Sequence, residues 1–124
     1  MCIRDRFNEG MKRFKGGDFW GAEEAFQWAM RLDPDNAEYV FRRGINLARI
    51  PRRGHEAEEV FAQAIKMAPS KIEYSLELGN FFARSGLKTK ALSVYQDALK
   101  RNPNSEKIKQ AIQKSSEGGP VGKK

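Results

Sequence analysis

The sequence has one cysteine and one histidine among 124 residues. A single cysteine cannot form an internal disulfide, and one cysteine with one histidine cannot supply the three or four ligands of a structural zinc site. Charged residues interrupt every apolar run, so none reaches the roughly 18 apolar residues that a membrane-spanning helix needs. These shortages exclude a disulfide scaffold, a zinc module and an inserted membrane protein, and we expect no metal or cofactor.

The length and the net charge of the chain indicate which class of protein it belongs to. A chain of 124 residues, 40% hydrophobic and 31% charged, is typical of one globular domain. Lysine and arginine total 23 against 16 aspartate and glutamate, a formal net charge of +7, which favours an acidic partner. The N-terminus lacks the apolar core of a secretory signal, so a cytoplasmic location is expected.

The first six residues, Met-Cys-Ile-Arg-Asp-Arg, match the translation of the end sequence left by a transposase-based sequencing library. We therefore expect residues 1–6 to be an adapter scar rather than native sequence. The natural reading frame would then be cut before Phe7, and the chain would be a piece of a larger, bacterial protein. The alternative is a genuine N-terminus that coincides with the adapter.

The chain contains an internal repeat. Proline recurs at Pro34, Pro69 and Pro103, in steps of 35 and 34 residues, and a glycine upstream of each recurs in the same steps. Between glycine and proline, a small, an aromatic and a second small residue keep constant spacing. The repeated residues are Gly10, Ala22, Phe26, Ala29 and Pro34, then Gly44, Ala57, Phe61, Ala64 and Pro69, then Gly79, Ala91, Tyr95, Ala98 and Pro103.

This pattern resembles the tetratricopeptide repeat family, which has W-x2-L-G-x2-Y, then A-x3-F, then P over about 34 residues. The third copy matches most closely, with Leu78-Gly79 and Phe82 followed by Ala91 and Tyr95. The resemblance implies an all-α solenoid of three antiparallel helix-turn-helix units. The expected boundaries are 7–36, 37–71 and 72–105 for the repeats, 106–114 for a capping helix, and 115–124 for a disordered basic tail.

Elementary packing agrees with this interpretation. Each glycine lets the second helix approach the first, and the aromatic residue fills the space between them. Each proline prevents the second helix from continuing. One helical pair cannot bury its apolar face alone, so neighbouring pairs must stack.

Three departures from the family pattern predict local differences. Glu9 and Arg13 stand where apolar residues are expected, which predicts a rotated or frayed first helix. Arg43 replaces a leucine, and its aliphatic stem is expected to cover a neighbouring surface. The turn 50–55 holds one extra residue, and its Pro51 ends the preceding helix.

No residues form a catalytic constellation, so a non-enzymatic protein is expected. His55, the only histidine, lies in a turn. Glu23 and Glu24 begin a second helix, where their charges complement the helix dipole.

The family resemblance implies a concave groove lined by the first helices, in which a peptide or protein segment binds. The residues carried over by position are Met11, Phe14 and Lys15 from the first copy, Phe41, Arg42, Ile45 and Arg49 from the second, and Leu76, Glu77, Asn80 and Arg84 from the third.

Lys15, Arg49 and Arg84 would form a basic row suited to an acidic or carboxylate-terminated peptide. The same cations would also stabilise helix C-termini without binding anything. The lysine and asparagine clamp of chaperone-tail-binding family members is not reproduced, because Phe7 and Met11 stand in its first places.

Other interpretations stay open at this point. The arginine cluster 42, 43, 49, 52 and 53 is either a solvated face or a nucleic-acid-binding surface. Trp20 and Trp28 lie off the inward stripe, so they either contact an upstream domain or partner, or pack over arginine and methionine side chains. The Pro-Arg-Arg turn also resembles three-repeat modules that follow a J-domain or a signalling domain in bacterial proteins.

Overall fold

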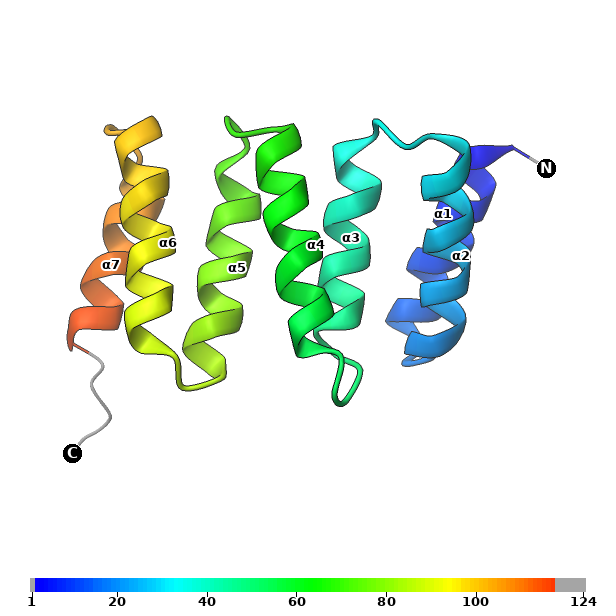
Figure 1. Cartoon of the computed structure of the whole chain (residues 1–124), viewed down its shortest axis with the longest axis horizontal. Helices are drawn as coiled ribbons and strands as arrows, with labels where there is room; N and C mark the ends of the chain where they lie inside the picture. The colour runs from blue at the N-terminus through cyan, green and yellow to red at the C-terminus, as the bar shows by residue number, and fades with distance from the viewer. Residues whose placement is uncertain (1, 118–124) are drawn as a thin grey trace. The chain divides into compact units, whose positions relative to one another are not determined.

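The structure, a computed structural model, describes residues 2–117, which form seven α-helices and no strand. The predicted all-α class of three helical hairpins with a further C-terminal helix is confirmed (Figure 1). The helices are α1 (Ile3–Lys15), α2 (Phe19–Leu32), α3 (Ala37–Leu47), α4 (Gly54–Met67), α5 (Ile72–Arg84), α6 (Lys88–Arg101) and α7 (Glu106–Glu117).

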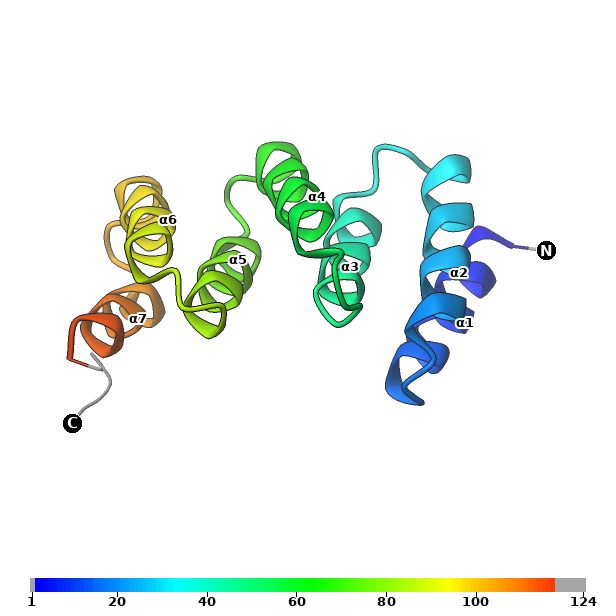
Figure 2. The ribbon, with the colours of Figure 1, turned by 60° about the horizontal axis from the view of Figure 1, so that its bottom comes forward.

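These helices belong to two compact units. The first unit contains α1 to α4, in which α1 pairs with α2, α3 pairs with α4, and α2 also packs against α3. The second unit contains α5 to α7, in which α5 pairs with α6 and α7 packs on both. Figures 1 and 2 show the two helices of each hairpin side by side.

Short polar side chains start several helices. Asp18 accepts a hydrogen bond from the Gly21 N–H at 2.9 Å at the start of α2, and Asn36 accepts one from the Tyr39 N–H at 3.3 Å at the start of α3. The helices α2, α4 and α6 each end two residues before a repeat proline. A proline disfavours helical geometry in the residue before it, which ends each second helix at the same place in the repeat.

The turn inside each hairpin requires a left-handed backbone. Gly17 and Gly86 take φ values of 85° and 80°, and Arg52 takes 70° at the corresponding place in the second hairpin. Glycine adopts this region without steric cost, whereas arginine does not. The longer turn of the second copy therefore places a non-glycine residue in an unfavourable conformation.

The repeated glycines lie against the repeated aromatic rings. A Cβ atom added at Gly10 would lie 2.6 Å from Phe26 Cε1, and one added at Gly44 would lie 2.9 Å from Phe61 Cδ1. A Cβ atom at Gly79 would overlap the Tyr95 ring. These rings are almost fully buried, so the absence of a side chain at each glycine sets the distance between the two helices.

The first hairpin is a regular part of the fold. The helix α1 begins at Ile3, within the segment 1–6, and runs without a break to Lys15. The sequence predicted a rotated or frayed helix here, and the fraying is not observed. Its Phe7 is buried, and the Phe7 ring stacks on Tyr39 of α3 with centroids 4.6 Å apart. Glu9 and Arg13 are exposed, outside the core, and pair with each other at 2.7 Å.

The last helix is longer than predicted. We expected it to end at residue 114, but α7 runs to Glu117, so residues 115–117 are helical rather than part of a tail. Its Ile108 is fully buried and anchors α7 in the second unit. The remainder of the predicted tail, 118–124, lies outside the described residues.

A charged cluster joins the first two hairpins. Glu23 on α2 is only 4% exposed, and its carboxylate pairs with Arg43 on α3 at 2.7 Å and with Arg53 at 3.7 Å. Glu56 on α4 pairs with Arg43 at 3.1 Å and accepts a hydrogen bond from Arg53. The predicted role of Glu23 as a dipole partner is wrong, because Glu23 lies beyond the first turn of α2 and its charge meets that of Arg43, 20 residues further along the chain. The cover that the aliphatic stem of Arg43 is expected to provide stays a prediction.

This cluster changes the ionisation of Glu56. Its hydrogen bond from Arg53, with the nearby charge of Arg43, lowers the pKa of the Glu56 carboxyl from its usual 4.5. The ionised form is therefore more favourable in the folded chain than in the unfolded chain.

We expect Gly79→Leu to destabilise the second unit by about 3 kcal/mol, because the new side chain would overlap the buried Tyr95 ring and force α5 from α6. Thermal unfolding followed by circular dichroism measures this loss. Gly16→Ala is the control, since a Cβ atom there meets only backbone oxygens at 3.6 Å and beyond. Unchanged unfolding of Gly79→Leu would contradict the packing.

We expect Arg43→Met to lower the free energy of unfolding by about 3 kcal/mol, because it removes the nearest partner of the buried Glu23 carboxylate. The double variant Glu23→Met with Arg43→Met should recover most of this loss, since no buried charge is then left unpaired. Urea denaturation measures both variants. A double variant that is less stable than Arg43→Met would contradict this account.

Protonation of Glu56 should lower the free energy of unfolding in acid. Its pKa is lower in the folded chain, so its ion pairs stabilise the fold above about pH 4.5 and are lost progressively as the pH falls below that value. Urea midpoints measured from about pH 7 to about pH 3 should fall less steeply for Glu56→Gln than for the unaltered chain. Glu59→Gln, at an exposed position of the same helix, should leave the slope unchanged.

Candidate functional site

The residues predicted to line a groove lie on α1, on and just after α3, and on α5. The first two groups belong to the first unit and the third to the second unit.

The α1 residues differ in exposure. Met11 and Phe14 are half-buried against the core formed around Phe7 and Phe26, whereas Lys15 is exposed as the last residue of the helix. The Phe14 ring also meets Phe19 edge-on, with centroids 5.6 Å apart. Met11 and Phe14 thus support the hairpin and leave Lys15 as the most accessible predicted group on α1.

On α3, one predicted residue is unsuited to binding. Phe41 is only 5% exposed, and its ring packs 6.1 Å from that of Phe61 on α4. We correct its role from groove lining to core packing, because a buried ring leaves almost no surface for a ligand. Arg42 lies over the Phe41 ring at 5.6 Å, and Ile45 is half-buried.

Arg49 lies outside the predicted first helix. The helix α3 ends at Leu47, so Arg49 belongs to the following turn and does not share the helix-end position of Lys15 and Arg84. Its guanidinium carbon lies 4.9 Å from the centroid of the Phe19 ring and 6.0 Å from that of Phe14. Arg49 is nevertheless exposed, since the rings support its side chain from one side.

We call Lys15, Arg49 and the supporting rings of Phe14 and Phe19 the Arg49 surface. The N–H groups of a guanidinium lie in its plane. They therefore stay available to acceptors when one flat face of the guanidinium packs on a ring. Lys15 is exposed as the last residue of α1 and adds a second positive charge at this end of the first hairpin. The arrangement can bind a carboxylate.

One of the α5 residues contacts a buried tyrosine. Asn80 accepts a hydrogen bond from the Tyr95 hydroxyl at 2.6 Å, and burial raises the pKa of Tyr95. Leu76 and Glu77 are half-buried, and Arg84 is exposed at the end of α5. The side-chain oxygen of Asn80 is thus already used within the second unit, and the alignment of Arg84 with the other two cations stays a prediction.

The arginine cluster is not a uniform solvated face. Arg43 and Arg53 form ion pairs with Glu23 and Glu56, and Arg53 also lies 5.2 Å from the Trp20 ring. These pairs neutralise two of its five positive charges. The surface offered to a nucleic-acid backbone is correspondingly less basic than the sequence indicated.

Within residues 2–117, no three histidine, cysteine, aspartate or glutamate side chains are grouped as ligands of a metal ion. No helix among the same residues has the length and apolarity to cross a membrane.

Sequence reasoning missed the pairing of Glu23 with Arg43. The available signal was an arginine in a leucine position together with an acidic residue on the preceding second helix. Residues 20 apart become neighbours only because α2 and α3 pack against each other.

Known proteins share this architecture. Residues 52–106 match the tetratricopeptide repeat family. A curated relative, small glutamine-rich tetratricopeptide repeat-containing protein 2 of Mycosarcoma maydis, is 27% identical over 109 residues, which cover 88% of this chain but only 31% of that protein.

Solved structures agree in fold. The first tetratricopeptide domain of Spaghetti (RPAP3) bound to the HSP90 peptide SRMEEVD is similar with a TM-score of 0.76 and 21% identity, covering 93% of each chain. The TPR2B domain of yeast Sti1 in its pHsp70 complex gives 0.76 and 21%, covering 93% of this chain and 96% of that one. The structure of MamA gives 0.77 and 21%, covering 94% and 67%.

Tetratricopeptide domains are in general non-catalytic protein-interaction modules. Residues 52–106 thus match the tetratricopeptide repeat family in sequence, and the three helical hairpins have the fold of tetratricopeptide domains.

Proposed function

We propose that this chain is a non-enzymatic scaffold that binds an acidic peptide segment at the Arg49 surface. The observation that carries the proposal is the position of Arg49, whose charged group rests on Phe19 and Phe14 yet stays exposed. Within residues 2–117, Arg49 forms no ion pair. Its in-plane N–H donors match the geometry of a carboxylate.

The charge of the surrounding helix supports the same ligand class. The last turn of α1 carries Lys12, Arg13 and Lys15. Among the residues that the structure describes, only Arg13 of these three is paired with carboxylates, those of Glu9 and Asp18. Such a concentration of positive charge raises the encounter rate with acidic segments and disfavours basic ones.

The structural relatives supply a probe. The HSP90 peptide SRMEEVD, seen with RPAP3, contains two glutamates and one aspartate. Because Phe7 and Met11 replace the first residues of the chaperone-tail clamp, the peptide serves here as an acidic segment rather than as the expected natural partner. Carboxylate side chains, more than the terminal carboxylate, should determine its affinity.

We expect labelled SRMEEVD to bind more tightly than its neutral analogue SRMQQVN, and Arg49→Glu to weaken binding of the acidic peptide about tenfold. Fluorescence anisotropy at low salt measures these affinities. Lys66→Glu, which makes the same charge change at an exposed position of α4, is the matched control. Equal affinity for both peptides, or equal weakening by Lys66→Glu, would contradict the proposed site.

A further inference from the structure

The outer side of α2 carries an exposed row of three apolar side chains and one acid. Its members, Trp20, Glu24, Trp28 and Leu32, follow each other at intervals of four residues and therefore form one continuous row on the helix. Trp20 is 62% exposed, Trp28 42% and Leu32 49%. We call this row the α2 ridge.

The repeat itself does not require this apolarity. The corresponding residues of α4 are His55, Glu59, Gln63 and Met67, and those of α6 are Thr89, Ser93, Asp97 and Arg101. The same place in the hairpin is thus mostly polar in the other two copies. Two exposed tryptophans on one such helix indicate a contact surface.

One acidic and one basic side chain lie on or beside the α2 ridge, on opposite sides of Trp28. Glu24 lies before Trp28 and Arg31 after it, and the Arg31 guanidinium carbon lies 5.5 Å from the centroid of the Trp28 ring. In the part of the chain that the structure describes, neither Glu24 nor Arg31 forms an ion pair. Both charges are therefore free to pair with another molecule.

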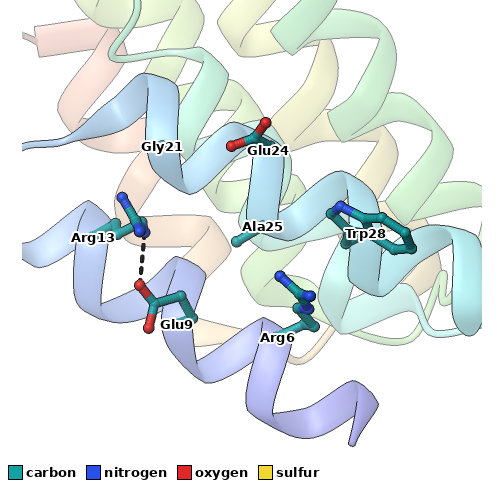
Figure 3. Close-up of a pocket in the computed structure, with 7 residues that line it drawn as sticks. All are labelled: Arg6, Glu9, Arg13, Gly21, Glu24, Ala25 and Trp28. Carbon is teal, nitrogen blue, oxygen red and sulfur yellow. Dashed lines mark hydrogen bonds and ion pairs between the residues drawn. The ribbon is translucent and has the colours of Figure 1, made fainter. Parts of the chain in front are cut away.

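A pocket of about 230 Å³ borders the ridge on its α1 side (Figure 3). Figure 3 shows Arg6 reaching from α1 toward Trp28, and its guanidinium carbon lies 5.3 Å from the centroid of that ring. Arg6 belongs to the segment 1–6, which we expect to be an adapter scar, whereas Arg31 belongs to α2 itself.

We propose that the α2 ridge binds the same ridge of a second copy of this chain, with the two α2 helices antiparallel about a twofold axis. A ridge with spacing of four residues packs into its own counterpart in the commonest class of helix crossing, at about −50°. With the axis between Glu24 and Trp28, Trp20 of one copy meets Leu32 of the second copy. Glu24 then meets Trp28 and the neighbouring Arg31 of the second copy.

The α2 ridge is complementary to itself, which favours a second copy of the chain over another protein as its binding partner. A twofold interface needs a patch whose two halves match each other, and the α2 ridge has apolar residues at both ends with one acid and one base about its middle. A purely apolar partner would instead leave Glu24 and Arg31 desolvated without a counter-charge.

The contact is small. One ridge on each copy covers less than the roughly 800 Å² per partner of a standard complex, so we expect a dissociation constant on the order of 10–100 µM. Sedimentation equilibrium of the full chain, from about 5 to about 500 µM, should show a monomer passing to a dimer. The sequence has two tryptophans, both on the ridge, so their emission should move to longer wavelength on dilution.

Substitutions at exposed residues of α2 test the proposed dimer contact without changing the core. Trp28→Ala, Glu24→Arg and Arg31→Glu should each weaken the dimer about tenfold. The double variant Glu24→Arg with Arg31→Glu should recover most of the affinity, because it exchanges the two charges that meet. Circular dichroism and thermal unfolding verify that each variant is folded.

The second hairpin provides matched controls. Glu59→Arg and Lys66→Glu make the same charge changes at the corresponding exposed positions of α4 and should leave the dimer unchanged. A chain that stays monomeric up to about 500 µM would overturn the proposal. So would a dimer that is insensitive to Trp28→Ala, or a charge exchange that restores nothing. Binding at the Arg49 surface is independent of these outcomes.

Discussion

The packing of an aromatic ring against a bare glycine backbone controls the geometry of every hairpin. Phe26, Phe61 and Tyr95 occupy the space that a side chain at Gly10, Gly44 or Gly79 would take. The rings are buried, and each lies between alanines that are also buried on the second helix. Because a close-packed interior transmits small changes in volume, this contact fixes the separation of the helices and hence the positions of the residues they expose.

The junction of the first two hairpins rests on charge as well as shape. Glu23, Arg43, Arg53 and Glu56 draw together α2, α3, α4 and the turn before α4. A buried carboxylate is costly unless paired, so the cluster favours the one arrangement of α2 and α3 that brings Glu23 to Arg43. The ring contact of Phe7 with Tyr39 adds an apolar connection between the same hairpins.

Two surfaces of the first unit remain available to other molecules, and both use arginine on aromatic rings. Arg49 rests on Phe19 and Phe14, whereas Arg31 lies beside Trp28. In each case the guanidinium carbon lies within 6.0 Å of a ring centroid, which is the range of a cation–π contact. The surfaces differ in their apolar content, since the rings under Arg49 are partly buried whereas the tryptophans of the α2 ridge are exposed. This difference is the reason that we propose an acidic segment for the first surface and a partner that also covers apolar area for the second.

The sequence by itself determined the helical hairpins, because glycine, alanine, aromatic residues and proline recur at intervals that local chain geometry imposes. Tertiary structure decided which charges meet and which groove residues are accessible. Arg43 finds Glu23, Phe41 becomes buried and Arg49 lies beyond its helix only once α2, α3 and α4 have packed. The physical reason is that helix periodicity depends on neighbours within a few residues, whereas ion pairing and burial depend on side chains that the fold brings together from 20 or more residues away.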